Sequence, residues 1–150
     1  MIRVVVLDAG PIGLLCHTRS SSLVVACRQW LQNLLAANNR VFIPEIADYE
    51  VRRELLRMNR ARALSHLNRL GTQLEYLPIS TPAMRLAADL WAQARQQGQS
   101  TAADNTIDSD VILAAQALTA GLSNVIVATT NVGHLARFVA SEIWQNVPTT

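Results

Sequence analysis

Residues 4–7, VVVL, form a short apolar run that ends at Asp8. A strand that is apolar on both faces is typical of the centre of a parallel sheet, where helices cover both sides. Gly10, Pro11 and Gly13 follow and predict a turn after this strand. The start of the chain therefore predicts an α/β fold in which an acid follows a central strand.

Helix and strand patterns alternate along the rest of the chain. The predicted helices cover residues 21–37, 45–59, 60–70, 81–98 and 108–120, and the further strands lie within 38–44, 74–79, 124–130 and 141–147. A serine cap, Pro44 as a first helical residue, a Thr81 cap and stops at Gly71, Gly98 and Gly121 set the helix ends. Residues 99–106 form a polar loop, and 131–138 a loop with a short helix. We expect a three-layer α/β/α sandwich with a mostly parallel, five-stranded sheet, in one domain spanning residues 1–150.

Composition narrows the class of protein. Half of the residues are hydrophobic and 16% are charged, which is below the usual share and indicates a packed subunit with some surface for a partner. No apolar run approaches the roughly 20 residues of a membrane span. Residues 1–7 resemble the start of a signal peptide, but the run stops at Asp8, so we expect a cytoplasmic protein. Cys16 and Cys27 lack the spacing of a metal site and are expected to be reduced.

Acidic residues are predicted to meet at one edge of the sheet. Asp8 ends the first strand, and Asp108 and Asp110 begin the helix that leads into the fourth. Glu50 lies on the helix after the second strand. Ligands of open parallel sheets bind at the carboxyl ends of the strands, and carboxylates that converge there need a cation. Mg²⁺ or Mn²⁺ suits such oxygen ligands and can activate water for attack on a phosphodiester.

Each acid also has a structural explanation. Asp8 can cap the turn after its strand, and Glu50 can pair with Arg53 on the helix surface. Asp108 and Asp110 project about 200° apart if both lie within a helix, so they share a site only if the helix begins between them. Asp110 is the favoured ligand, and Asp108 is an auxiliary ligand or a helix cap.

Arginine carries all of the strong positive charge, because the sequence contains no lysine. Six arginines gather in one segment: Arg52, Arg53, Arg57, Arg60, Arg62 and Arg69. Such a segment can bind nucleic-acid phosphates, form the solvated face of a helix or meet an acidic partner. The absence of lysine, and Gly10 where a second aspartate would be needed, disfavour haloacid-dehalogenase-type phosphatases and receiver domains.

Four segments in order resemble the PIN-domain family of metal-dependent ribonucleases, which includes the toxins of VapBC-type toxin–antitoxin pairs. They are VVVLDAGPIG, IPEIADYEVRREL, DSDVILAAQAL and VATTNVGHL. The resemblance assigns catalytic and metal-binding roles to Asp8, Glu50 and Asp110, and matches Thr130 and Asn131 to the family's T-x-N or T-x-D element. It implies a dimer, RNA as substrate, Mg²⁺ or Mn²⁺ as cofactor and a small antitoxin as partner.

The sequence departs from the family pattern at two places. Ala9 and Gly10 replace a small polar pair, and Asn131 stands where an acid is common. Asp108 is expected to compensate as an auxiliary metal ligand, with Thr130 and Asn131 orienting water. Arg52, Arg53 and Arg57 are the expected RNA contacts. Two alternatives stay open: an RNA-processing nuclease without an antitoxin, and an inactive PIN scaffold that binds RNA or protein.

Overall fold

The computed structural model describes residues 2–98 and 104–150 and contains a five-stranded sheet in which every pairing is parallel. The strand order is β3-β2-β1-β4-β5, which places the apolar β1 at the centre, as predicted. The strands are β1 (Val4–Leu7), β2 (Arg40–Pro44), β3 (Glu75–Leu77), β4 (Val125–Thr129) and β5 (Ser141–Ile143). All five strands therefore end at the same edge of the sheet.

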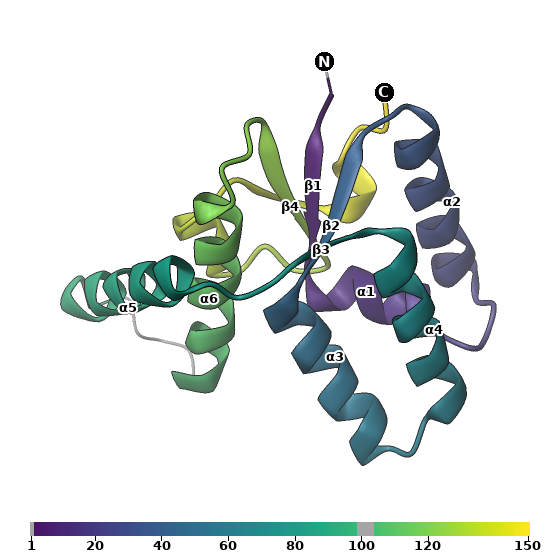
Figure 1. The fold of residues 1–150 in the computed structure, drawn as a ribbon, viewed down its shortest axis with the longest axis horizontal. Coiled ribbons are helices and arrows are strands. Elements are labelled where there is room, and N and C mark those ends of the chain that lie inside the picture. Colours follow the sequence, from purple (N-terminus) through teal and green to yellow (C-terminus); the bar gives the residue numbers. More distant parts are fainter. Residues whose placement is uncertain (1, 99–103) are drawn as a thin grey trace.

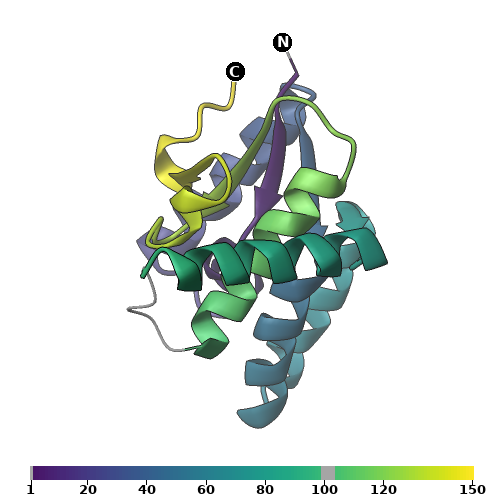
Figure 2. The ribbon, with the colours of Figure 1, turned by 90° about the vertical axis from the view of Figure 1, so that its left-hand side faces the viewer.

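Helices cover both faces of this sheet, which gives the expected three layers (Figure 1). The helices are α1 (Ala9–Cys16), α2 (Ser22–Ala36), α3 (Glu45–Arg57), α4 (Ala61–Gln73), α5 (Thr81–Gln96) and α6 (Asp104–Thr119), with short 3₁₀ turns η1 (Leu135–Arg137) and η2 (Trp144–Asn146). Figure 2 shows α5 and α6 together in front of one face, while α1, α2 and α4 lie behind the sheet. None of the helices in the described residues is long and apolar enough to cross a membrane.

The alternation of side chains along β1 divides the core in two. Val5 and Leu7 pack with α1, α2 and α4, whereas Val4 and Val6 pack with α6 and η1. All four side chains are at most 5% exposed, so both faces of this strand are covered. The continuous apolar run follows from this double burial.

The predicted turn after β1 is instead a helix, because α1 begins at Ala9. Gly10 and Pro11 weakened the helical pattern, but both lie in the first turn, where backbone N–H groups have no partner within the helix. α4 likewise continues past Gly71 to Gln73, Pro44 ends β2 rather than beginning α3, and Ser80 rather than Thr81 caps α5. The Ser21 cap of α2 is as predicted.

Helix α6 begins earlier than the sequence indicated. It starts at Asp104, not at Asp108, so residues 104–106 are helical rather than part of a loop. The rest of the predicted loop, residues 99–103, lies outside the described residues. The earlier start places Asp108 and Asp110 inside the helix, and this decides how the two acids are oriented.

The C-terminal segment is fastened to the rest of the molecule by polar and aromatic contacts. The Trp30 and Trp144 rings lie 5.5 Å apart between centroids, and Trp30 Nε1 donates a hydrogen bond to Val147 O at 3.1 Å. Arg3 Nη1 donates to Pro148 O at 2.6 Å. The two ends of the chain consequently lie together, away from the carboxyl ends of the strands (Figure 1).

Candidate active site

Asp8 is held at the carboxyl end of the central strand by two hydrogen bonds. Its Oδ1 accepts from the Ala9 backbone N–H at 2.7 Å, as the N-cap of α1, and its Oδ2 accepts from Thr129 Oγ1 at 2.8 Å. Thr129 is almost fully buried, with 1% of its surface exposed. Asp8 is therefore both a helix cap and an oriented carboxylate whose remaining lone pairs are available to a ligand.

Thr129, rather than Thr130, is the threonine that contacts this acid. The register of β1 and β4 pairs Leu7 with Ala128, so the next residue on each strand faces the other at the end of the sheet. Sequence reasoning matched Thr130 and Asn131 to the T-x-N or T-x-D element, although the threonine two positions before Asn131 is Thr129. The register of the structure, which sequence reasoning did not predict, places Thr129 beside Asp8.

Thr130 instead packs against the first turn of α1. A Cβ atom added to Gly10 would lie 2.3 Å from Thr130 Oγ1, which is far inside van der Waals contact. The close approach of β4 to α1 therefore requires glycine at this position. This explains the departure at Gly10: the residue is set by packing beside the acid.

Glu50 comes from α3 and is oriented by α6. Ser109 donates a hydrogen bond to its carboxylate, and the two helices pack against each other. Burial raises the pKa of Glu50, the negative charge of Asp8 raises it further, and the Ser109 bond and the charge of Arg53 oppose the rise. Glu50 and Asp8 thus lie close enough to repel each other. The sequence did not predict this role of Ser109, because a serine between Asp108 and Asp110 matches no recognised motif by itself.

Asp110 completes the group. Burial raises its pKa to about 6, with smaller contributions from the charges of Asp8 and Glu50, while Arg137 opposes the rise. Asp8 raises the pKa of both Glu50 and Asp110, and Glu50 raises that of Asp110, so the three carboxylates lie close enough to repel one another. The fold brings Asp8, Glu50 and Asp110 together from β1, α3 and α6, and we refer to these three residues as the carboxylate site.

Asp108 is separated from this group. The helix does not begin between Asp108 and Asp110, so the condition for both to face one site is not met. Two positions apart on a helix, they point about 200° from each other. Asp108 is exposed and Asp110 is half-buried. The expectation that Asp108 caps the helix is wrong, because α6 starts four residues earlier.

Asn131 follows the end of β4. Its backbone N–H donates to Thr129 Oγ1 at 3.2 Å, and its side chain is exposed. It therefore supports the threonine that orients Asp8 and leaves its own amide in solvent.

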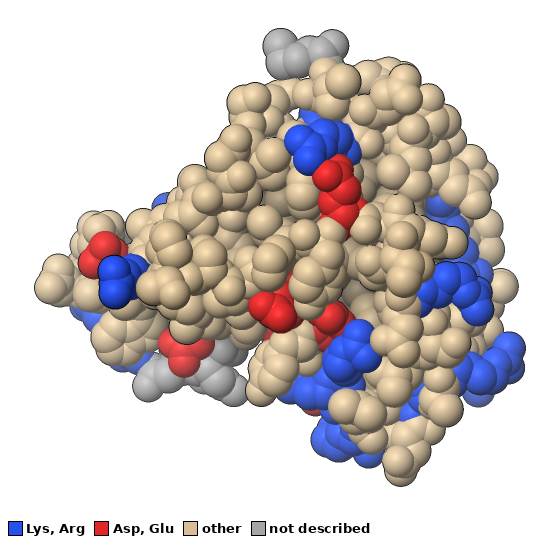
Figure 3. All heavy atoms as spheres, in the orientation of Figure 1, with Lys and Arg blue, Asp and Glu red and all other residues tan. Residues whose placement is uncertain are grey.

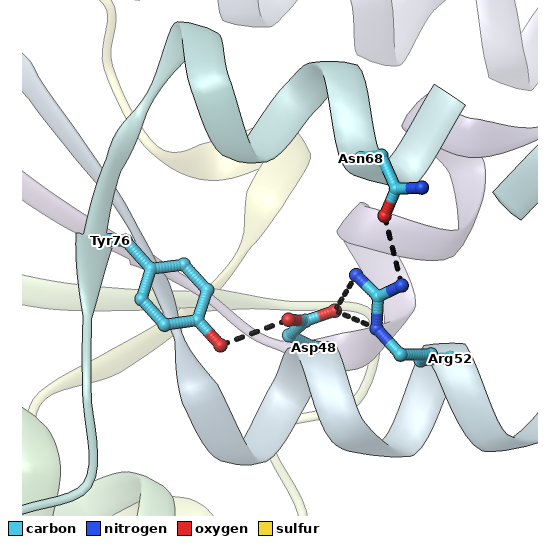
Figure 4. A network of polar contacts seen from close by, with 4 residues as sticks. All are labelled: Asp48, Arg52, Asn68 and Tyr76. Carbon is cyan, nitrogen blue, oxygen red and sulfur yellow. Dashed lines mark hydrogen bonds and ion pairs between the residues drawn. The ribbon is translucent and has the colours of Figure 1, made fainter. Parts of the chain in front are cut away.

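The three arginines predicted to bind RNA have different surroundings. Arg52 is committed to Asp48 at 3.0 Å and to Asn68 at 2.9 Å, within a network that also includes Tyr76 (Figure 4). Burial and the bond to Asp48 raise the pKa of Tyr76, so its phenol stays protonated and donates to Asp48 at neutral pH.

Arg57 and Arg53 lie one turn apart on α3 and have different partners. Arg57 pairs with Glu54 at 2.7 Å. Arg53 lies over the exposed Tyr49 ring, 5.2 Å from its centroid, and acts on Glu50. Figure 3 shows arginine atoms gathered over the α3, α4 and α2 side, with carboxylate atoms nearer the centre of the same view. Of the three, Arg53 is the one whose charge acts on an acid of the carboxylate site.

The donor chemistry of the carboxylate site suits a hard divalent cation. It offers oxygen ligands only, and their mutual repulsion is what a bound cation would relieve. Among the described residues, no three His, Cys, Asp or Glu side chains converge closely enough to form a ready-made metal cage. Mg²⁺ commonly keeps several waters and is completed by substrate oxygens, so it can bind through few protein ligands.

A model of the PIN domain matches residues 5–137, which include Asp8, Glu50 and Asp110. The chain belongs to the PIN-domain family. The match covers the sheet through η1, so this PIN domain holds all three acids of the carboxylate site within its family region. No curated protein matches the sequence.

Solved structures with the same fold resemble this PIN domain over almost its whole length. VapBC2 from Rickettsia felis, bound to a DNA fragment from its promoter, has a TM-score of 0.73 at 19% identity, over 94% of this chain and 98% of that chain. FitAcB from Neisseria gonorrhoeae has a TM-score of 0.66 at 21% identity, over 95% and 99%. DNA-bound VapBC from Salmonella typhimurium has a TM-score of 0.67 at 18% identity, over 96% and 99%. At these identities the likeness establishes the fold.

Proposed function

We propose that this PIN domain is an endoribonuclease that hydrolyses RNA phosphodiester bonds with Mg²⁺ or Mn²⁺, as the toxin of a toxin–antitoxin pair. The observation that carries the proposal is the carboxylate site: Asp8, Glu50 and Asp110 come from three separate elements and repel one another. Three partly buried acids held together destabilise an apo protein, and a cation offsets that cost. A purely structural role would not require them to meet.

The residues of the carboxylate site have different roles in binding the ion. Asp8 is the main ligand, because Thr129 and the Ala9 N–H fix its orientation before any ligand arrives. Asp110 and Glu50 supply further carboxylate oxygens from the opposite side, with Ser109 fixing Glu50. A bound divalent ion would lower the pKa of water and stabilise the charge that develops on the phosphate oxygens. Asp108 has no part in this ligand set.

The proposed partners follow from the solved structures of the same fold. Two of those structures are named VapBC, the type of toxin–antitoxin pair to which the sequence resemblance points. A small antitoxin and a second copy of this chain are the proposed protein partners. The exposed apolar side chains of α3 and its surroundings, which include Tyr49, Leu56 and Met58, offer surface for such contacts.

The experiment that tests the function compares wild type, Asp110→Asn and Asp108→Asn on a mixed-sequence RNA. Both variants remove one charge from the same helix, so Asp108→Asn controls for net charge and for folding. We expect wild type and Asp108→Asn to cleave with Mn²⁺, and Asp110→Asn and all samples in EDTA to be inactive. Equal cleavage by all three proteins would refute the proposed site.

The inactive-scaffold alternative rests on Asn131 and is separated by metal binding. If the scaffold is inactive because it binds no ion, Mn²⁺ leaves its melting temperature unchanged. An ion that binds the folded state must raise the melting temperature. At an ion concentration one hundred times the Kd, the free energy of unfolding increases by about 2.7 kcal/mol.

A further inference from the structure

An RNA strand approaching the carboxylate site meets an electrostatic obstacle. Each nucleotide carries a negative phosphate, and the site itself holds three acids. A bound cation neutralises part of this charge, and basic side chains next to the site must supply the rest. Two of the expected basic residues are occupied, because Arg52 pairs with Asp48 and Arg57 pairs with Glu54.

Two arginines do act on the acids of the site, and they come from different elements. Arg53 on α3 acts on Glu50, and Arg137 on η1 acts on Asp110. Both side chains belong to exposed residues. α3 and η1 each pack against α6, which carries Asp110 between them. Each of these two elements thus brings one guanidinium near an acid of the carboxylate site.

Local contacts hold each of these arginines in place. Arg53 lies over the Tyr49 ring at 5.2 Å, and this ring is 55% exposed, so its other face is open to a stacked base. Arg137 contacts His134 Nδ1 through its Nη2, within the loop that follows β4. A guanidinium held in this way loses less side-chain entropy when it binds a phosphate.

We propose that Arg53 and Arg137 form an arginine pair that binds backbone phosphates of an RNA strand lying at the carboxylate site. The pair rests on the proposed ribonuclease function and adds Arg137, which lies outside the arginine-rich segment of the sequence. Guanidinium groups bind phosphate oxygens bidentately and do not lose their charge at neutral pH. The pair sets the position and direction of the strand over Asp8.

RNA binding in EDTA tests the pair without cleavage. The probe is a labelled single-stranded 12-nucleotide RNA of mixed sequence, and its Kd is measured across salt concentrations. For Arg53→Gln and for Arg137→Gln we expect about fivefold weaker binding at low salt, and a slope of log affinity against log salt that is about 0.7 smaller for each lost phosphate contact. The double variant should lose about twice that slope.

Two variants serve as matched controls. Arg57→Gln removes a paired arginine from the same helix as Arg53, and Arg85→Gln removes an exposed arginine on α5. Both should keep the wild-type slope. If all four single variants bind alike, the pair does not exist. Arg137→Lys keeps the charge and should recover the slope, as a charge-dependent phosphate contact requires.

Cleavage assays with Mn²⁺ separate this proposal from the function on which it rests. If RNA is cut and the KM of the two variants rises at nearly unchanged kcat, both stand. If RNA is cut but neither KM nor the salt slope changes, the arginine pair is wrong and the nuclease stands. If binding depends on the pair but no RNA is cut, the pair stands as an RNA contact and the nuclease is wrong.

Discussion

At the scale of single residues, the position of the Asp8 carboxylate depends on a buried hydroxyl. Thr129 Oγ1 donates to Asp8 Oδ2 and accepts from the Asn131 N–H, so one atom joins β1, β4 and the following loop. The β-branched side chain also has few accessible rotamers. The sequence indicated that Asp8 would be functional, and the structure adds the group that orients it.

We expect Thr129→Val to weaken both stability and metal binding. It preserves the shape but leaves Asp8 Oδ2 and the Asn131 N–H without their partner, at a cost of about 1–3 kcal/mol in the free energy of unfolding. Thr129→Ser, which keeps the hydroxyl, should retain most of the Mn²⁺-induced rise in melting temperature. Chemical denaturation and melting curves with and without Mn²⁺ measure the two effects. Equal loss of the Mn²⁺ effect in both variants would contradict an orienting role for the hydroxyl.

Asp110 should make the apo protein less stable as the pH rises. Its pKa is about 6 in the folded protein and 3.8 ordinarily. Between these values the unfolded chain releases the proton and the folded chain keeps it, so the free energy of unfolding falls with increasing pH. Glu50, whose pKa is also raised, adds to the same trend.

Asp110→Asn should therefore be more stable than wild type at pH 7 in EDTA. After allowance for solvent screening of this partly exposed group, we expect a gain of about 1–2 kcal/mol that vanishes near pH 4. Melting curves from pH 4 to pH 7 measure it. Asp108→Asn serves as the control and should follow the wild-type pH dependence. A gain in stability that does not change with pH would mean that the negative charge of Asp110 does not destabilise the folded protein.

At the scale of elements, the packing of α1 against β4 is decided by one glycine. Gly10 faces Thr130, whereas Gly13, one turn later on the same helix, has nothing within 4 Å of an added Cβ. The two positions therefore offer a matched comparison within one helix. The same substitution must displace a neighbouring side chain at the first and meets open space at the second.

Gly10→Ala should destabilise the protein by about 1–3 kcal/mol through overpacking. Gly13→Ala should stabilise it by about 0.5–1 kcal/mol, because alanine favours the helix. Combining Gly10→Ala with Thr130→Ala removes the two closest atoms and should recover much of the loss. Urea denaturation measures all three. If both glycine variants are equally stable, the contact between α1 and Thr130 is not tight in solution.

The elements also show how far the sequence could predict the fold. The buried apolar runs of β1 and β2 predicted the centre of the sheet, because burial determines those residues. The edge strand β5 and the serine cap of α2 were also predicted, the cap from its local hydrogen-bonding chemistry. Gly10, Pro11 and Gly13 led to the wrong prediction of a turn at α1, because tertiary packing rather than helix propensity stabilises this helix. The polar residues before Asp108 were predicted as a loop, so the start of α6 was placed too late. The different orientations of Asp108 and Asp110 on the helix were therefore not predicted. Thr129, Ser109 and Arg137 were missed because their roles arise from contacts between distant segments.

At the scale of the whole molecule, the C-terminal segment stabilises the fold from outside the sheet. Trp144 is 3% exposed and packs in a tilted arrangement against Trp30, whose indole N–H donates to Val147 O. These contacts join the last residues to α2, more than one hundred positions earlier.

Trp144→Ala should therefore cost about 3–5 kcal/mol, the usual loss for a buried tryptophan. The adjacent Gln145 is exposed, and Gln145→Ala should change stability by less than about 0.5 kcal/mol. The comparison is made by urea denaturation, with RNA cleavage at low temperature as a check that the carboxylate site survives. A mild effect of Trp144→Ala would mean that the segment frays without unfolding the core.

The hydrogen bond between Arg3 and Pro148 has a consequence for engineering. It places both chain ends at one pole of the molecule, while Asp8 lies at the other end of β1 (Figure 1). A short linker joining the ends would close the chain into a ring without approaching the carboxylate site, and new termini could then be cut at Asn59, in the exposed turn between α3 and α4. Such a circular permutant keeps every strand pairing and frees the tip of this hairpin to carry a reporter.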